Sequence, residues 1–180
     1  LVRSPGAYLM EPKDATKQVF IANLMPSRGS WLELEIDKKG IAYARIDRKR
    51  KLPITTLLRA LPLEDPTTGF QLDTSTNEKI LALFDGSVYI QNTLEKDTTT
   101  REEEALIEVF KKQRPGEPPT LDNARNLLKA LFFDPKRYDL TKVGRYKLNQ
   151  RLGVGVPEDT RVLTTEDILA LVRRLIALPT

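Results

Sequence analysis

RGSWLELEIDKKGIAYARIDRKRK, residues 28–51, decides the fold of the N-terminal third of this chain. Apolar and charged residues alternate from residue 31 to residue 37, which is the period of a β-strand with one buried face. The following DKKG favours a turn, because Gly40 can take the positive φ that tight turns require. Residues 41–47 form the return strand. The stretch therefore predicts an antiparallel hairpin that leads into a basic segment.

A further strand precedes the hairpin. Residues 19–25, VFIANLM, are apolar on both faces and are followed by Pro26, which ends the strand. Together with the hairpin, this segment predicts a small antiparallel sheet in residues 1–51, with one face buried and one in water.

Beyond residue 52 the apolar residues follow the period of an α-helix. The predicted helices are approximately residues 53–61, 77–84, 100–113, 120–132, 140–152 and 164–176. Residues 87–94 fit either a helix or an extended segment. We therefore predict an α+β fold, with a small antiparallel sheet in the N-terminal third and a body of about five to six helices in residues 52–180.

Helix ends are marked by several local signals. Thr100 with Glu103, and Thr164 with Asp167, have the spacing of a capping box at a helix N-terminus. Gly153 suits the C-terminal end of the helix before it.

The composition excludes several kinds of site. The 180 residues suffice for one domain with a real core or for two small ones. The chain contains no Cys and no His, which excludes disulfides, Cys/His zinc sites, Cys nucleophiles and a His general base. No apolar run approaches about 18 residues, so no transmembrane helix is predicted. The start LVRSP, without Met or a signal-peptide pattern, indicates a piece of a larger protein.

The net charge is only +4, but the cations are concentrated after the hairpin. The basic residues of this run are Arg45, Arg48, Lys49, Arg50 and Lys51. Such a run is commonly a solvated strand end. It also fits a ridge that binds nucleic-acid phosphates, because phosphate contacts dominate nucleic-acid affinity. Composition alone leaves both interpretations open.

Trp31 is the single tryptophan, and strand alternation places it on the face opposite Leu32 and Leu34. A tryptophan on a polar face is unusual, because its exposure gains nothing for folding. Either the helical body covers it, or it lies just outside the strand, or it is a platform on which an unpaired base stacks, a contact worth about 1–3 kcal/mol. In the last case Arg28, beside Gly29, would hold a phosphate next to it.

The acidic residues do not indicate catalysis. Glu102, Glu103 and Glu104 stand at a predicted helix N-terminus, where negative charge complements the helix dipole. The chain has no Asp-x-Asp metal cluster, no Gly-rich phosphate loop and no Gly-x-Ser-x-Gly motif. The sequence therefore predicts no active site of its own.

Five stretches, read in order, resemble the β subunit of bacterial DNA-directed RNA polymerase. They are VRSPGAY (2–8), PSRGSWLELEID (26–37), RIDRKRKLPITTLLRAL (45–61), QRPGEPPT (113–120) and LFFDPKRYDLTKVGRYKLNQRLG (131–153). The resemblance is to the lobe domain, which is the second domain of the subunit and one jaw of the DNA cleft. It extends over nearly all of residues 1–180 and is weakest in residues 62–100, where some members carry a large insertion.

The resemblance implies a non-catalytic role in transcription. In the family, the lobe encloses DNA near the downstream edge of the bubble and contacts the non-template strand. Trp31 then corresponds to the tryptophan that stacks on a non-template base, and Arg3 to the arginine of the RSPG motif in the same region. Arg48, Lys49 and Arg50 correspond to the basic run that is placed to meet DNA phosphate.

The resemblance also implies the surroundings of the domain. The parent enzyme is a nucleotidyltransferase whose catalytic Mg²⁺ is bound by aspartates of the β′ subunit, so no cofactor is expected in this chain. The expected partners are DNA, the β′, α and ω subunits, and σ factor or other regulators, in the bacterial cytoplasm at the nucleoid and without a membrane.

An alternative function is that of a docking module for transcription factors or σ. The helical surface around residues 114–120 and the sheet edge at residues 19–25 are the candidate surfaces, since an exposed strand edge is a template for pairing. Capture of a regulator without salt-dependent DNA binding would favour this alternative.

Overall fold

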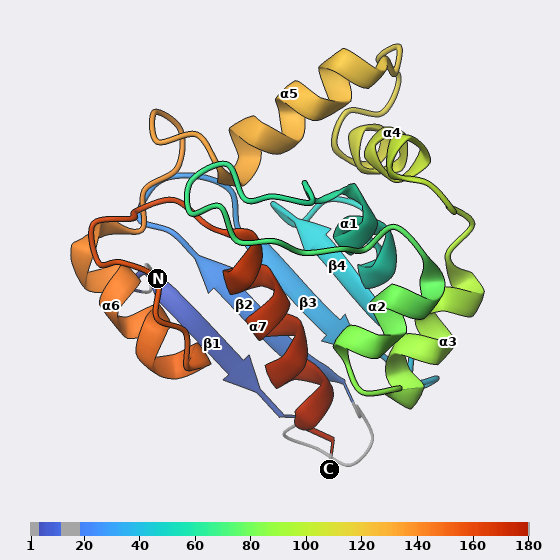
Figure 1. Cartoon of the computed structure of the whole chain (residues 1–180), viewed down its shortest axis with the longest axis horizontal. Helices are drawn as coiled ribbons and strands as arrows, with labels where there is room; N and C mark the ends of the chain where they lie inside the picture. Colours follow the sequence, from blue (N-terminus) through green and yellow to red (C-terminus); the bar gives the residue numbers. More distant parts are fainter. Residues whose placement is uncertain (1–3, 12–18, 180) are drawn as a thin grey trace.

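The computed structural model describes residues 4–11 and 19–179 and shows an antiparallel sheet covered by helices (Figure 1). The strands, in spatial order, are β1 (Gly6–Met10), β2 (Phe20–Met25), β3 (Leu32–Ile36), β4 (Ala42–Ile46) and β5 (Leu52–Pro53). The helices are α1 (Ile54–Ala60), α2 (Asn77–Leu83), α3 (Val88–Lys96), α4 (Glu102–Gln113), α5 (Leu121–Phe132), α6 (Thr141–Leu152) and α7 (Thr165–Ala177). The predicted α+β fold is confirmed.

One face of the sheet is buried under α7, which packs across β1, β2 and β3 (Figure 1). The alternation in β3 explains this arrangement. Leu32, Leu34 and Ile36 are at most 2% exposed, whereas Glu33 and Glu35 between them are only partly buried on the opposite, polar face. At the two sides of the sheet, α1 and α3 pack against β4, and α6 lies beside β1.

The number of helices and the free edge of the sheet differ from the prediction. The described residues form seven helices, because residues 88–96 are helical and the Ser87 side chain caps them by accepting a hydrogen bond from Tyr89 N. Residues 6–10 form β1 and pair with β2. β2 therefore lies inside the sheet, and the prediction that residues 19–25 offer a free edge is wrong.

Of the two predicted capping boxes, one is confirmed and one is wrong. The Thr164 side chain accepts from Asp167 N, and Asp167 Oδ2 accepts from Thr164 N at 2.9 Å. At α4 the N-cap is Arg101, which makes no side-chain cap. Thr100 instead donates from its backbone and hydroxyl to Glu104 Oε1, at 3.3 and 2.9 Å, so the helix begins one residue later than the spacing predicts.

Asp167 also pairs with a buried arginine of α6, although the sequence pattern gave it only a capping role. Arg145 and Asp167 are both fully buried and are joined by two hydrogen bonds of 2.8 and 2.9 Å. Arg145 also donates to the carbonyls of Thr160 and Val162, at 2.7 and 2.5 Å. This single guanidinium therefore holds together α6, α7 and the segment that leads into α7.

Candidate nucleic-acid interface

Trp31 lies at one end of the sheet, immediately before β3. Trp31 N donates to Asp47 Oδ1 at 2.8 Å, and Asp47 N donates to Trp31 O at 2.9 Å, so the pairing with the β4 side continues past the strand. Trp31 lines a small cavity together with Asn23, Glu33 and Arg45 of the polar face. The interpretation that it lies just outside the strand is confirmed, yet its side chain still belongs to the polar face. Trp31 as a whole residue is 38% exposed, so the helical body does not bury it.

Arg48 is the member of the basic run that contacts Trp31. Its guanidinium carbon lies 5.2 Å from the centroid of the indole, which is cation–π distance. A tight turn directs it there, since Asp47 and Arg48 have φ values of +53° and +58°. This left-handed conformation costs a residue such as Arg48 about 1–2 kcal/mol, whereas Asp adopts it more readily. Backbone strain of this kind clusters at functional sites.

Two residues that line the cavity beside Trp31 each have a buried polar side-chain atom without a hydrogen-bond partner among the described residues. The atoms are Asn23 Oδ1 and Arg45 Nε. Asn23 is only 5% exposed, and Arg45 pairs with Glu35 at 3.5 Å through a different nitrogen. An unpaired buried polar atom costs about 1–3 kcal/mol. Both atoms belong to residues that line the cavity beside the exposed indole.

The other cations of the run have different surroundings. Lys49 Nζ donates to the carbonyl of Gln113 at 3.0 Å, at the C-terminal end of α4, where a cation complements the helix dipole. Lys51 Nζ lies 4.4 Å from the centroid of the Tyr43 ring. Arg50 is exposed. The structure thus brings Arg48 to Trp31, gives Lys49 a structural contact and leaves Arg50 open to solvent.

Arg28 attaches the loop that carries Trp31 to the segment after α5. Its guanidinium donates to the carbonyl of Pro135 at 3.2 Å. Its backbone pairs with Asp139, with Arg28 N to Asp139 O at 3.2 Å and Asp139 N to Arg28 O at 2.8 Å. Arg161 binds the Asp139 carboxylate at 2.6 and 2.8 Å, and these hydrogen bonds lower the pKa of that carboxyl. Arg28 is exposed, so its phosphate contact stays a prediction beside this structural role.

Three further residues complete the comparison with the prediction. Arg3 lies outside the described residues. The sequence predicts Asn23 only as part of an apolar strand, because its position in the cavity beside Trp31 depends on the pairing of β2 with β3. Gly29 has a φ of +125° and lies against Tyr138, a contact that no local pattern indicates.

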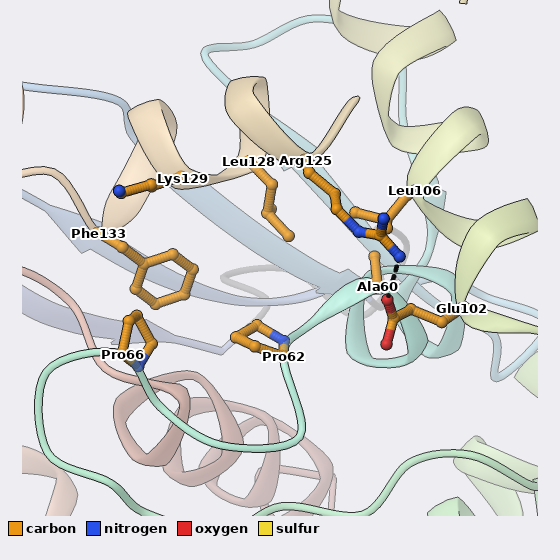
Figure 2. Close-up of a pocket in the computed structure, with 9 residues that line it drawn as sticks. All are labelled: Ala60, Pro62, Pro66, Glu102, Leu106, Arg125, Leu128, Lys129 and Phe133. Carbon is orange, nitrogen blue, oxygen red and sulfur yellow. Dashed lines mark hydrogen bonds and ion pairs between the residues drawn. The ribbon is translucent and has the colours of Figure 1, made fainter. Parts of the chain in front are cut away.

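A second cavity, of about 210 Å³, lies in the helical part of the molecule (Figure 2). Its lining residues come from α1, α4, α5 and the loop segments that follow α1 and α5, and they are Ala60, Pro62, Pro66, Glu102, Leu106, Arg125, Leu128, Lys129 and Phe133. Arg125 and Glu102 form an ion pair of 3.3 Å on one side, and Lys129 stands on the other (Figure 2). The cavity is mainly apolar, so it suits an apolar side chain better than a nucleotide.

A membrane-spanning helix and a cluster of metal ligands are both absent from the part of the chain that the structure describes. No helix in residues 4–11 and 19–179 is long and apolar enough to cross a membrane. The same residues contain no group of three or more His, Cys, Asp or Glu side chains that could hold a metal ion.

The sequence matches the family described as RNA polymerase Rpb2, domain 2, over residues 3–179. Three similar proteins are each called DNA-directed RNA polymerase subunit beta. Those from Rubrobacter xylanophilus and Syntrophomonas wolfei are 59% identical over 178 residues and 50% identical over 179 residues, which covers 99% of this chain and 15% of each relative. The one from Geobacillus kaustophilus is 52% identical over 155 residues, or 86% of this chain and 12% of the relative. The chain thus spans 15% or less of the length of these relatives.

Proposed function

This chain belongs to the RNA polymerase Rpb2 domain 2 family, and from this membership we propose that it is the lobe domain of a bacterial DNA-directed RNA polymerase β subunit. Its proposed role is to bind the non-template DNA strand at the downstream edge of the bubble, without catalysing a reaction. The observation that supports this role is the exposed indole of Trp31 with the Arg48 guanidinium against its ring. Aromatic platforms combined with cations are how proteins hold unpaired bases and their phosphates.

Arg48 has two tasks in this proposal. In the free chain it lies against the Trp31 ring, where the cation–π contact holds the indole in place. When a base stacks on Trp31, we expect the guanidinium to turn to the adjacent phosphate, since a charge-assisted bond to phosphate is the stronger contact. Asn23 and Arg45 line the small cavity beside the indole.

The activity of the whole enzyme is part of the proposal. A β subunit acts with β′, α and ω in nucleotide addition, in the bacterial cytoplasm, and it takes σ for initiation. The resemblance to the family assigns the catalytic Mg²⁺ to the β′ subunit. The residues of this chain would bind and orient DNA for that distant active site.

We expect a single-stranded DNA oligonucleotide to quench the fluorescence of Trp31, the only tryptophan of the chain, with an affinity that falls as salt rises. Changing Arg48 and Arg50 to Ala should reduce the slope of log affinity against log salt by about 1.4, since each phosphate contact on a single strand contributes about 0.7. Lys49 is left unchanged because of its bond to Gln113.

The matched control is the double change Lys38→Ala and Lys39→Ala. Replacing these two exposed lysines removes the same amount of positive charge, but from the hairpin turn at the opposite end of the sheet. Their loss should leave the salt slope nearly unchanged. Absence of quenching at low salt would contradict base stacking on Trp31, and an equal slope in both double variants would contradict the phosphate contacts.

The apolar cavity of Figure 2 favours docking of a protein partner as a second candidate function. Interface hot spots are mostly aromatic or arginine side chains that fill such pockets. Lys129 on the rim favours a partner segment with a carboxylate beside the apolar side chain. Of the two docking surfaces predicted from the sequence, the β2 edge is not available because β2 pairs on both sides. Residues 114–120 are exposed, and the cavity is a further candidate surface.

A cavity-filling change tests the docking candidate. Ala60 is 2% exposed and lines the cavity, so Ala60→Leu should occupy the space into which a side chain would insert. Displayed random peptides selected on the chain should share an apolar residue next to Asp or Glu, and should bind Ala60→Leu at least about tenfold more weakly, which corresponds to the loss of one buried side chain. Peptides that bind both chains equally would contradict the candidate.

A further inference from the structure

A polar groove lies at the edge of the sheet, between the start of β1 and α6. The groove has a volume of about 590 Å³, and its lining residues are Ser4, Pro5, Gly6, Ala7, Tyr8, Lys147, Gln150 and Arg151. Lys147 and Arg151 are the charged members of this lining, and both are exposed. No carboxylate of the described residues belongs to it.

The approach of α6 to β1 brings the two cations to the groove. A Cβ atom on Gly144 would lie 2.8 Å from Pro5 Cβ, so the helix comes this close because the residue is glycine. One turn later, Lys147 Cβ lies 3.8 Å from the position of a Cβ on Gly6. Arg151 follows Lys147 by four residues and therefore lies on the same side of the helix.

The charge arrangement indicates an anionic ligand. Neither Lys147 nor Arg151 takes part in an ion pair among the described residues. Like charges four residues apart destabilise an isolated helix by about 0.2–0.5 kcal/mol. These two cations therefore do not serve the fold through pairing, and they face a groove with no counter-charge.

The groove is continuous with the polar face that carries Trp31. Tyr8 pairs with Asn23, and Asn23 pairs with Glu33, so these three side chains share one face of the sheet. Gly6 pairs with Met25, and extending the register of β2 and β3 by one residue places Met25 opposite Trp31. Trp31 is thus two strand spacings, about 10 Å, from the start of β1.

We propose that Lys147 and Arg151 bind phosphates of the same single strand whose base stacks on Trp31. The inference rests on the proposed function and extends it from one stacked base to a path along the end of the sheet. A stacked strand advances about 3.4 Å per nucleotide, so the groove is reached about three nucleotides away from the stacked base. The path begins at Arg48, passes Trp31 and ends between β1 and α6.

The double change Lys147→Ala and Arg151→Ala tests the path. With an oligothymidine of about ten nucleotides, the salt slope should fall by about 1.4, because two phosphate contacts are lost. With one of about two nucleotides, which spans Trp31 but not the groove, affinity and quenching should equal those of the unchanged chain. The control is again Lys38→Ala with Lys39→Ala, which removes the same net charge from the other end of the sheet.

The two proposals fail in different ways. If neither oligonucleotide quenches Trp31 in the unchanged chain, the proposed function is contradicted and the path with it. If both quench but the Lys147/Arg151 variant keeps the full salt slope with the longer one, the path alone is overturned. A slope that falls equally in the control variant would also overturn it, because the effect would then be one of net charge. Both cations are exposed, so neither change is expected to unfold the chain.

Discussion

Replacing Asp167 with Ala is expected to lower the free energy of unfolding by about 3–5 kcal/mol, the cost of removing one partner from a buried ion pair. The Arg145 guanidinium would stay fully buried and lose its two carboxylate bonds of 2.8 and 2.9 Å. The change also removes the capping bond from Thr164 N at the start of α7. Urea denaturation followed by circular dichroism measures this loss.

Two further variants test whether the burial of the ion pair causes that loss of stability. Asp139→Ala removes an Asp–Arg pair with similar bond lengths, but Arg161 is half-exposed and water can take over its bonds, so the loss should be clearly smaller. Changing Arg145 to Met together with Asp167 to Leu removes both charges and should recover much of the stability, because apolar residues can replace a buried pair. Equal losses in the two single Asp variants would contradict the importance of burial.

Much of the fold was predictable because its signals are local. The hairpin of β3 and β4 follows from alternation within a few residues, and α7 from its apolar stripe and capping box. Arg145 was not predictable in the same way. It lies in α6, which has three other cations and a weak apolar pattern, so nothing local distinguishes a buried arginine from the exposed ones. The edge position of β1 likewise depends on pairing with β2 and not on its own five residues.

In the candidate site, too, some features follow from local sequence signals and others depend on contacts between distant residues. Strand alternation predicts that Trp31 lies on the polar face of the sheet, and composition reveals the basic run. The contact between Arg48 and the indole depends on two positive φ values in a turn. Asp47 is a residue type that tolerates this conformation, but nothing in the sequence indicates it for Arg48. The attachment of Arg28 depends on Pro135, which is 107 residues away in the sequence. Local patterns therefore indicate the residues of the candidate interface but not the contacts that position them.

Replacing Gly29 with Ala is expected to cost about 3 kcal/mol or more and to displace Trp31. A Cβ at this position would lie 2.7 Å from Tyr138 Cδ2, 3.0 Å from Arg137 O and 3.1 Å from Tyr138 Cα, so both side chain and backbone would have to move. Overpacking of this kind costs about 1–3 kcal/mol. The φ of +125° adds strain of about 1–3 kcal/mol for any residue with a side chain.

Gly116→Ala is the matched control for Gly29→Ala. Gly116 also has a positive φ, of +87°, but a Cβ there would meet no atom within 4 Å, so its loss of stability reports backbone strain without overpacking. The difference between the two variants therefore measures the contact between the Trp31 loop and Tyr138. Because Trp31 follows Gly29 by two residues, its emission maximum should shift in the folded Gly29 variant and stay unchanged in the Gly116 variant. Equal stabilities and equal spectra would mean that the loop is not held by this contact, and the position of Trp31 would then need another cause.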